Sequence, residues 1–360
     1  MGQQPNLGLY RKFLVLTITA VCLLILVGGV VRSTGSGMGC PDWPKCFGNW
    51  VPPTDEQELP NNYKDVYAQK RHQKNLRLAN YLESFGFEEL VDRLRNDQSI
   101  LVEETFNPTK TWTEYLNRLL GVLIGFLFIV NVFFAFLNRK SNPKLLGLVI
   151  LNLVIVIFQG WVGSIVVSTN LLVGMISFHM ILALLILALL IYNYWLIKEP
   201  EEINSTNTGL VDRAVILIFI ALILFTVQVV FGTQVRESID SIASRLGQAA
   251  RSVWVSELGL SFYIHRSFSI VILAAHGYFA FVVYRLFGQE PIIRFVYVLV
   301  GLLIVEVLTG TLMAYFAIPP VFQPIHLLLA TLIFGVDFYL LLQLTALRNS
   351  KQVELIGNPE

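Results

Sequence analysis

Residues Leu14–Val31 read Leu-Val-Leu-Thr-Ile-Thr-Ala-Val-Cys-Leu-Leu-Ile-Leu-Val-Gly-Gly-Val-Val, a run of 18 residues without a charged side chain. As a helix rising about 1.5 Å per residue, this run nearly spans the roughly 30 Å of a bilayer's hydrocarbon core. A signal peptide is the alternative, because the run follows Arg11 and Lys12. However, a signal peptide has an apolar region of only about 7–15 residues and a small-residue cleavage site. The run therefore predicts a retained transmembrane helix.

The rest of the chain has the same character. Apolar residues make up 55% and charged residues 14%, against about 45–50% and about 25% in soluble domains. Backbone groups in lipid must be hydrogen-bonded internally, and the apolar runs do not alternate with polar residues as barrel strands do. We therefore predict an all-α integral membrane protein with eight transmembrane helices. The seven further runs lie at about 115–137, 145–167, 171–197, 214–235, 259–284, 293–317 and 321–347.

The distribution of Lys and Arg predicts the orientation of the chain. Eight spans put both termini on one side, where the short segments carry eleven Lys and Arg residues, against three on the other side. Positive charge is enriched in cytoplasmic loops, so both termini are expected in the cytoplasm. The formal net charge is +1, so no basic surface points to nucleic acid as a partner.

The long segment from about 34 to 112 then lies on the outer face. Its stretch from Tyr63 to Asp97 has helical spacing and many charges, which predicts a helical cap. Cys40 and Cys46 lie in the segment Gly-Cys-Pro-Asp-Trp-Pro-Lys-Cys. On the oxidising side of a membrane such a pair favours a disulfide, with two free thiols or a metal pair as alternatives.

The two halves of the chain resemble each other. Glu-Tyr-Leu-Asn-Arg at 114–118 matches Phe-Tyr-Ile-His-Arg at 262–266 with an offset of 148 residues. An offset of 147 relates Gln159 to Glu306, Gly163 to Gly310 and His179 to His326, and 29–32 aligns loosely with 232–236. Such repeats often bracket the functional site of a membrane protein. We predict two pseudo-repeated four-helix bundles, residues 1–200 with the outer loop 34–112, and residues 201–360.

Two histidines of the second half suggest an iron site. His265 and His326 lie at similar depth in the outer half of the membrane, on helices expected to face each other. Two neutral imidazoles so arranged can hold a haem iron from both faces. Arg266 follows directly and could pair with a haem propionate, because guanidinium and carboxylate pair in a bidentate way. The alternative is histidines that hydrogen-bond across helices.

The first half differs at one ligand position. His179 is present, but the residue that matches His265 is Asn117, which is a poor iron ligand. Glu114 lies one helical turn before Asn117 on the same face. A carboxyl group beside an incompletely ligated iron is suited to chemistry, whereas an iron with two axial ligands is suited to electron transfer. The alternative for Glu114 is an interfacial carboxylate paired with Arg118.

His276 and Glu306 are further ionisable residues within the spans. His276 has no partner histidine at its depth, which favours a hydrogen-bonded core residue. Glu306 lies in the middle of the seventh span, where it is either protonated and hydrogen-bonded or part of a proton path.

Several segments together resemble the heme A synthase family. The similarity covers nearly all the spans, whereas the outer insert from about 50 to 105 lies outside it. The segments are 28–43, which reads Gly-Gly-Val-Val-Arg-Ser-Thr-Gly-Ser-Gly-Met-Gly-Cys-Pro-Asp-Trp, Glu-Tyr-Leu-Asn-Arg at 114–118, Gln-Gly-Trp-Val-Gly at 159–163, His-Arg at 265–266 and Pro-Ile-His at 324–326.

This resemblance implies an enzyme that oxidises haem O to haem A. The C8 methyl group of the porphyrin becomes a formyl group, through hydroxylations and loss of water from a geminal diol. It also implies two four-helix bundles, with haem b between His265 and His326 in the second, and an outer cysteine pair that matches Cys40 and Cys46.

The first bundle would bind the substrate haem. The resemblance assigns His179, Asn117 and Arg118 to this site, and Glu114 as the catalytic residue, a proton relay or charge stabiliser. Arg118 and Arg266 are expected near propionates, and Arg32 and Arg236 are weaker candidates for the same contact.

The family commonly has a histidine pair in the first bundle, and Asn117 departs from that pattern. Two other functions therefore stay open, a non-catalytic haem carrier and a transmembrane b-type cytochrome for electron transfer. The expected partners are haem O, a haem O synthase, cytochrome oxidase assembly proteins and the lipids of a bacterial inner (plasma) membrane. A homo-oligomer is left open.

Overall fold

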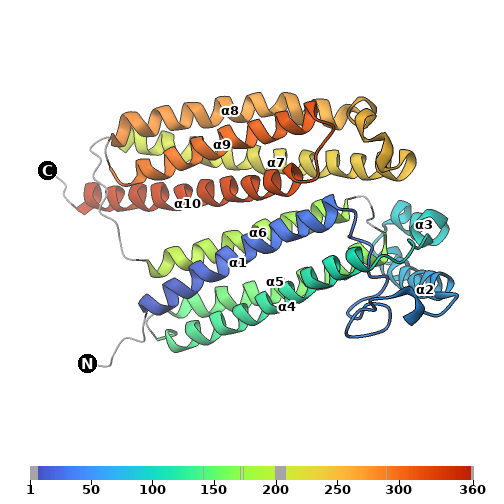
Figure 1. The fold of residues 1–360 in the computed structure, drawn as a ribbon. Helices are drawn as coiled ribbons and strands as arrows, with labels where there is room; N and C mark the ends of the chain where they lie inside the picture. Colours follow the sequence, from blue (N-terminus) through green and yellow to red (C-terminus); the bar gives the residue numbers. More distant parts are fainter. Residues whose placement is uncertain are drawn as a thin grey trace.

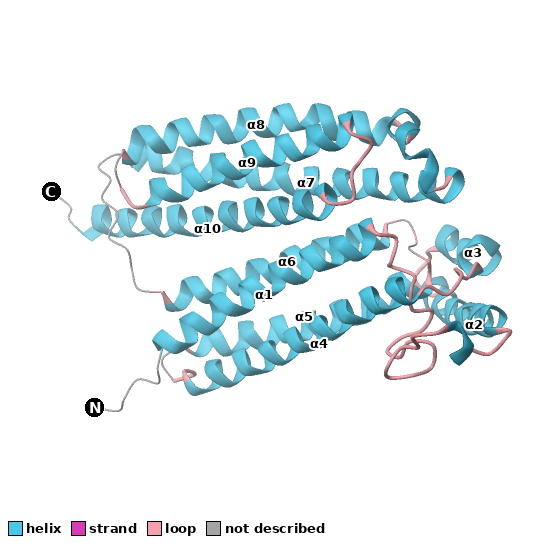
Figure 2. Ribbon diagram, in the orientation of Figure 1, coloured by secondary structure: helices cyan, strands magenta, loops and turns pink. Residues whose placement is uncertain are grey.

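The computed structural model describes residues 7–140, 142–170, 172, 174–198, 208–288 and 290–357. Among these residues, eight helices are long and apolar enough to cross a membrane, as predicted. They are α1 (Leu7–Ser33), α4 (Pro108–Leu137), α5 (Pro143–Ser168), α6 (Met175–Ile197), α7 (Thr208–Leu246), α8 (Leu260–Phe287), α9 (Ile292–Tyr315) and α10 (Phe322–Gly357). Figure 2 shows only helices and loops in this part of the chain.

The eight long helices lie side by side in two groups (Figure 1). One group is α1, α4, α5 and α6, and the other is α7 to α10. The groups pack together mainly through α1 and α10. At this contact a Cβ atom on Gly29 would lie 3.0 Å from the Cα atom of Pro324, so a side chain there would have to push the α10 backbone away. The internal repeat and the division of the chain into residues 1–200 and 201–360 stay predictions. The boundary at 200/201 lies outside the described residues.

The outward faces of the helices are apolar. Phe126 on α4, Ile270 on α8 and Tyr297 on α9 are 60%, 69% and 61% exposed, respectively. Apolar side chains exposed in this number would be unfavourable in water but are solvated by lipid tails. The buried cores are also apolar, with Phe128 and Leu145 in the first bundle and Phe279 and Leu299 in the second. The chain is a multi-pass membrane protein.

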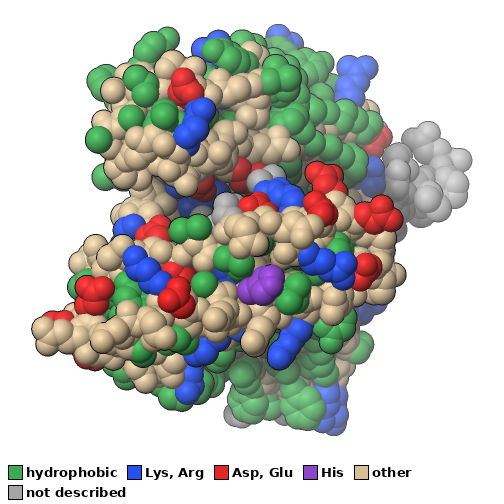
Figure 3. Space-filling view, turned by 90° about the vertical axis from the view of Figure 1, so that its right-hand side faces the viewer, with side chains coloured by type: hydrophobic (Ala, Val, Ile, Leu, Met, Phe, Trp, Pro, Cys, Tyr) green, Lys and Arg blue, Asp and Glu red, His purple; other side chains and the backbone are tan. Residues whose placement is uncertain are grey.

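The predicted helical cap is a pair of helices, α2 (Tyr63–Glu83) and α3 (Glu88–Asn96), at the end of the bundles where α1 ends (Figure 1). Short 3-10 turns flank it, η1 (Glu56–Glu58) and η2 (Gln98–Leu101). Seen from that end, the surface carries mixed acidic and basic side chains (Figure 3). A surface with so many charged side chains is typical of a region exposed to water and not to lipid.

Helix α7 is longer than the apolar run 214–235 predicted. It continues to Leu246, and the turns η3 (Gln248–Val253) and η4 (Val255–Glu257) follow it. The extension is amphipathic, because Ile239 and Ile242 pack against the buried Trp254. The charges that end the apolar run therefore do not end the helix.

Candidate functional site

The loop that follows α1 is closed by a disulfide between Cys40 and Cys46. This confirms the predicted pairing. The loop packs on the outer end of α4, where Thr111 Oγ1 donates a hydrogen bond to the carbonyl oxygen of Gly39 at 2.8 Å. A Cβ atom on Gly39 would lie 2.6 Å from the Lys110 carbonyl, so the loop is held closely against the helix.

Glu114 and Arg118 of α4 form hydrogen bonds with the backbone of this loop. Glu114 Oε1 accepts from Arg118 Nη2 at 2.5 Å, and Oε2 accepts from the amide of Cys40 at 2.9 Å. Arg118 Nη1 donates to the carbonyls of Asp42 at 2.6 Å and Lys45 at 3.0 Å. Glu114 is only 4% exposed. Both terminal nitrogens of Arg118 are thus bonded to the loop and to Glu114, and the expected contact of Arg118 with a propionate stays a prediction.

His179 and Asn117 belong to the first bundle, on α6 and α4. A Cβ atom on Gly163 would lie 3.4 Å from His179 Cε1, and one on Gly28 would lie 4.0 Å from Asn117 Oδ1. Both His179 Nδ1 and Asn117 Oδ1 are buried and hydrogen-bond to no described residue. A polar atom left without a partner in this way is a candidate ligand-binding group.

His265 and His326 line one cavity of about 520 Å³ in the second bundle. They come from the first two turns of α8 and α10, and their ring centroids lie 6.4 Å apart with the ring planes at 79°. Each ring packs against a glycine of a neighbouring helix. A Cβ atom added to Gly232 would lie 3.2 Å from His265 Cε1. A Cβ atom added to Gly310 would lie 3.3 Å from His326 Cε1.

Three arginines line the same cavity, namely Arg32, Arg236 and Arg266. Arg266 was expected near a haem propionate, with Arg32 and Arg236 as weaker candidates for the same contact, and these contacts stay predictions. Asp240 was not predicted from the sequence as a site residue, but its carboxylate accepts from Arg32 Nη2 at 2.6 Å and from Arg236 Nη2 at 2.5 Å. The signal that could have revealed it is the spacing of four residues between Arg236 and Asp240 on one helix.

His276 does not line this cavity. Its Nδ1 lies 2.8 Å from the Ile272 carbonyl oxygen and its Nε2 lies 3.0 Å from Asp337 Oδ2. Both side chains are fully buried. Since both ring nitrogens are hydrogen-bonded, neither is available to a metal.

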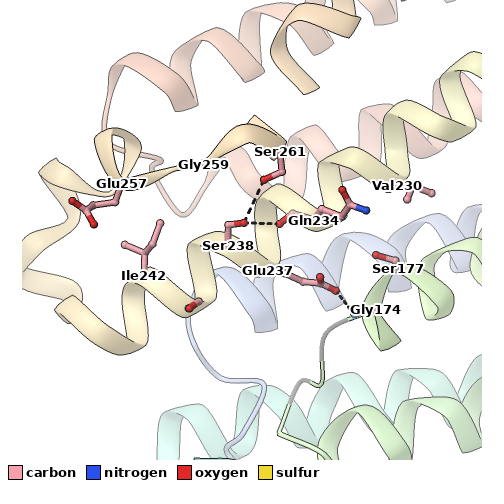
Figure 4. A pocket seen from close by; sticks show the side chains of 11 residues that line it. Gly174, Ser177, Val230, Gln234, Glu237, Ser238, Ile242, Glu257, Gly259 and Ser261 are labelled. Carbon is pink, nitrogen blue, oxygen red and sulfur yellow. Dashed lines mark hydrogen bonds between the residues drawn. The ribbon is translucent and has the colours of Figure 1, made fainter. Parts of the chain in front are cut away.

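A second hollow, of about 610 Å³, opens between the outer ends of α6, α7 and α8 (Figure 4). Hydroxyl groups and carboxylates line it, among them Ser177, Ser238, Glu237 and Glu257. Glu237 accepts a hydrogen bond from the Gly174 amide at 2.9 Å. None of the residues that line this hollow was predicted as a site residue.

The cavity of the second bundle fits a haem. Metal–imidazole nitrogen bonds are about 2 Å long, so two imidazoles on opposite sides of one iron have ring centroids roughly 6 Å apart. The separation of His265 and His326 agrees with this value. The apolar walls, the arginines and the volume are those of a cofactor pocket, which is typically about 300–1,000 Å³. These features define a multi-pass helical membrane protein with a histidine-paired cavity that the second bundle forms together with residues of α1 and α6.

The chain matches the cytochrome oxidase assembly protein family over residues 11–337, and it belongs to that family. Several relatives carry the name heme A synthase. That of Shewanella oneidensis is 23% identical over 82% of this chain and 84% of its own length. That of Ehrlichia ruminantium strain Gardel is 22% identical over 92% of both chains. That of Wolbachia pipientis subsp. Culex pipiens is 23% identical over 90% of this chain and 94% of its own.

Proposed function

We propose that this protein is a heme A synthase, a membrane oxidoreductase that converts the C8 methyl group of haem O into the formyl group of haem A. The observation that carries the proposal is the difference between the bundles. The second bundle has two histidines at the spacing of an iron's axial ligands, and the first has one histidine with an asparagine at the matching sequence position. Membership of the family and the names of its relatives support the same activity.

The second bundle would hold haem b between His265 and His326. When bound, this haem supplies a one-electron redox centre. The protein's part is to hold both imidazoles in place against Gly232 and Gly310 and to exclude water with apolar side chains. Arg266, Arg32 and Arg236 would face the propionates. Asp240 neutralises part of the charge of the last two.

The first bundle would bind haem O as its substrate, with His179 as the protein ligand of the iron. Asn117 offers an amide oxygen with no partner among the described residues, which is a weak ligand. One face of the substrate iron would thus stay free of a strong protein ligand. Such an asymmetric site is suited to oxidation, whereas the second bundle is suited to electron transfer.

Glu114 would supply the negative charge at the edge of the substrate site. It is buried and paired with Arg118, which holds its carboxylate in one position beneath the disulfide loop. Fixed charges in a dry site stabilise developing charge without reorganisation, which is how we infer that Glu114 contributes. The site would lie near the outer face of a bacterial plasma membrane, with both termini in the cytoplasm.

The test is to co-express the chain with a haem O synthase in cells that lack haem A, and to separate the extracted haems by chromatography. The expected result is haem A from the wild-type protein and its loss in Glu114→Ala. Glu104→Ala is the matched control, because Glu104 pairs with Lys110 at an exposed position of the outer loop. If cells with the wild-type protein contain haem O and no haem A, the enzymatic function is rejected, and a non-catalytic haem carrier is indicated instead.

A further inference from the structure

The Nδ1 atom of His326 lies between two oxygen atoms of α9. Thr309 Oγ1 is 3.0 Å away and Glu306 Oε2 is 3.2 Å away. The Thr309 hydroxyl donates its own proton to the Glu306 carbonyl oxygen at 2.9 Å. Because a hydroxyl has one proton to donate, Thr309 must accept from His326. The proton of the neutral imidazole is therefore on Nδ1, which leaves the Nε2 lone pair for a metal.

The other two histidines of the candidate sites lack this arrangement. Nδ1 of His265 and Nδ1 of His179 are buried, and neither hydrogen-bonds to a residue in the described part of the chain. Instead, their backbone carbonyl oxygens accept hydrogen bonds. Gln228 Nε2 donates to that of His265 and Gln159 Nε2 to that of His179, each at 2.9 Å. These contacts fix the helices but leave the imidazole rings unassisted.

Glu306 is a carboxyl group within a membrane span, and its side chain is 13% exposed. Its Oε2 atom is buried and lies 3.2 Å from Nδ1 of the His326 imidazole. Placing an ionisable group at this depth is costly and usually marks a function. Its counterpart in the repeat, Gln159, reaches a backbone carbonyl and not an imidazole ring. The carboxyl-to-histidine contact therefore distinguishes the second bundle from the first.

We propose that Glu306 and Thr309 are positioning residues that hold His326 with its proton on Nδ1, and that Glu306 makes His326 the stronger donor of the two axial ligands. This inference rests on the proposed binding of haem b between His265 and His326. Thr309 accepts from Nδ1 and fixes the ring, and a carboxylate 3.2 Å from the same N–H stabilises its positive end and so raises the basicity of a metal-bound histidine. A more basic ligand stabilises the ferric state, so Glu306 lowers the reduction potential of this haem.

The experiment is a spectroelectrochemical titration of the purified full-length protein and of Glu306→Gln. The midpoint potential of the haem in Glu306→Gln is expected to be more positive, because a neutral amide replaces the carboxyl group at nearly the same size. Glu306→Asp, which keeps the carboxyl group, is expected to lie between the two. Glu237→Gln removes a carboxylate from the outer hollow, away from the His326 ring, and is expected to shift the potential much less.

An unchanged potential in a haem-loaded Glu306→Gln protein overturns the inference and leaves the proposed function intact. If the Glu306→Gln protein loses its haem, the haem content of Glu306→Asp becomes the test of the inference. Retained haem in Glu306→Asp supports a need for the carboxyl group, whereas equal loss overturns it. A wild-type protein without haem, or one whose haem spectrum survives His326→Ala, would instead reject the haem b site itself.

Discussion

Arg32, at the end of α1, and Asp240, in α7, form an ion pair that joins the two bundles, with Arg32 Nη2 2.6 Å from Asp240 Oδ2. Arg32 Nε donates to the same oxygen at 3.0 Å, and Arg236 Nη2 donates to Oδ1 at 2.5 Å. Arg236 Nη2 also reaches the Arg32 carbonyl oxygen at 3.0 Å. The cavity of the second bundle is thus completed by a residue of the first, so the two bundles meet at the wall of this cavity.

Asp240→Asn is expected to weaken this junction by about 2 kcal/mol, because the charge-assisted hydrogen bonds to two arginines are lost. An amide also turns an NH2 group toward a guanidinium, which cannot accept it. Thermal unfolding of the detergent-solubilised protein should show the loss. Ser241→Ala, one residue further along α7, is the control. Equal unfolding temperatures for the two variants would contradict a structural role for the Arg32–Asp240 pair.

Gly310→Ala is expected to reduce haem binding in the second bundle roughly 10-fold or more, a cost typical of disturbing the surroundings of a metal ligand. The new methyl group would lie 3.3 Å from His326 Cε1 and would push the ring from its place. Gly301→Ala is the matched control on the same helix, because its Cβ atom would meet nothing within 4 Å. Haem content per polypeptide, measured after purification, distinguishes the two. Similar haem content in both variants would show that the glycine does not set the ring position.

Much of this fold follows from local sequence. The length and hydropathy of a run such as 14–31 are sufficient to predict a membrane helix, since lipid offers the backbone no hydrogen-bond partner. The end of α7 could not be predicted in the same way. Its last turns are amphipathic, and only the packing of Ile239 and Ile242 on Trp254 shows that they remain helical.

The site was only partly predictable for a related reason. His265 and His326 were paired from their similar depth and from the expectation that their helices face each other, because residues at one depth on facing helices meet. The sequence did not predict that Arg118 donates to the loop carbonyls of Cys40, Asp42 and Lys45. The need of those carbonyls for a donor depends on how the loop folds back on α4, which spacing along the chain does not reveal.

Arg71→Met is expected to destabilise the outer cap by about 3–5 kcal/mol, as removal of one partner of a buried ion pair does. Arg71 is 1% exposed and donates to the carbonyls of Ile100 and Val102 and to the carboxylate of Glu103. Burial raises the pKa of Glu103 to about 7, against the opposing effect of Arg71. Limited proteolysis of the cap should report the loss.

The double variant Arg71→Met with Glu103→Leu tests the cause of that loss. It is expected to recover part of the protease resistance, because no unpaired charge then stays buried. A double variant no more resistant than Arg71→Met would show instead that the carbonyl contacts of Arg71, and not its pairing with Glu103, hold the cap.

Asn117→His is expected to give the first bundle a second axial ligand. A Cβ atom on Gly28 would lie 4.0 Å from Asn117 Oδ1, so α1 leaves space there, as Gly232 does beside His265. With two imidazoles the substrate iron becomes six-coordinate, so haem content per polypeptide should rise and more of the ferric haem should be low-spin. Leu116→His places the same imidazole on a side chain position that is 56% exposed to lipid, and it should change neither quantity. Identical absorption and EPR spectra for the two variants would mean that Asn117 does not face the iron, and the asymmetry between the bundles would lose its chemical meaning.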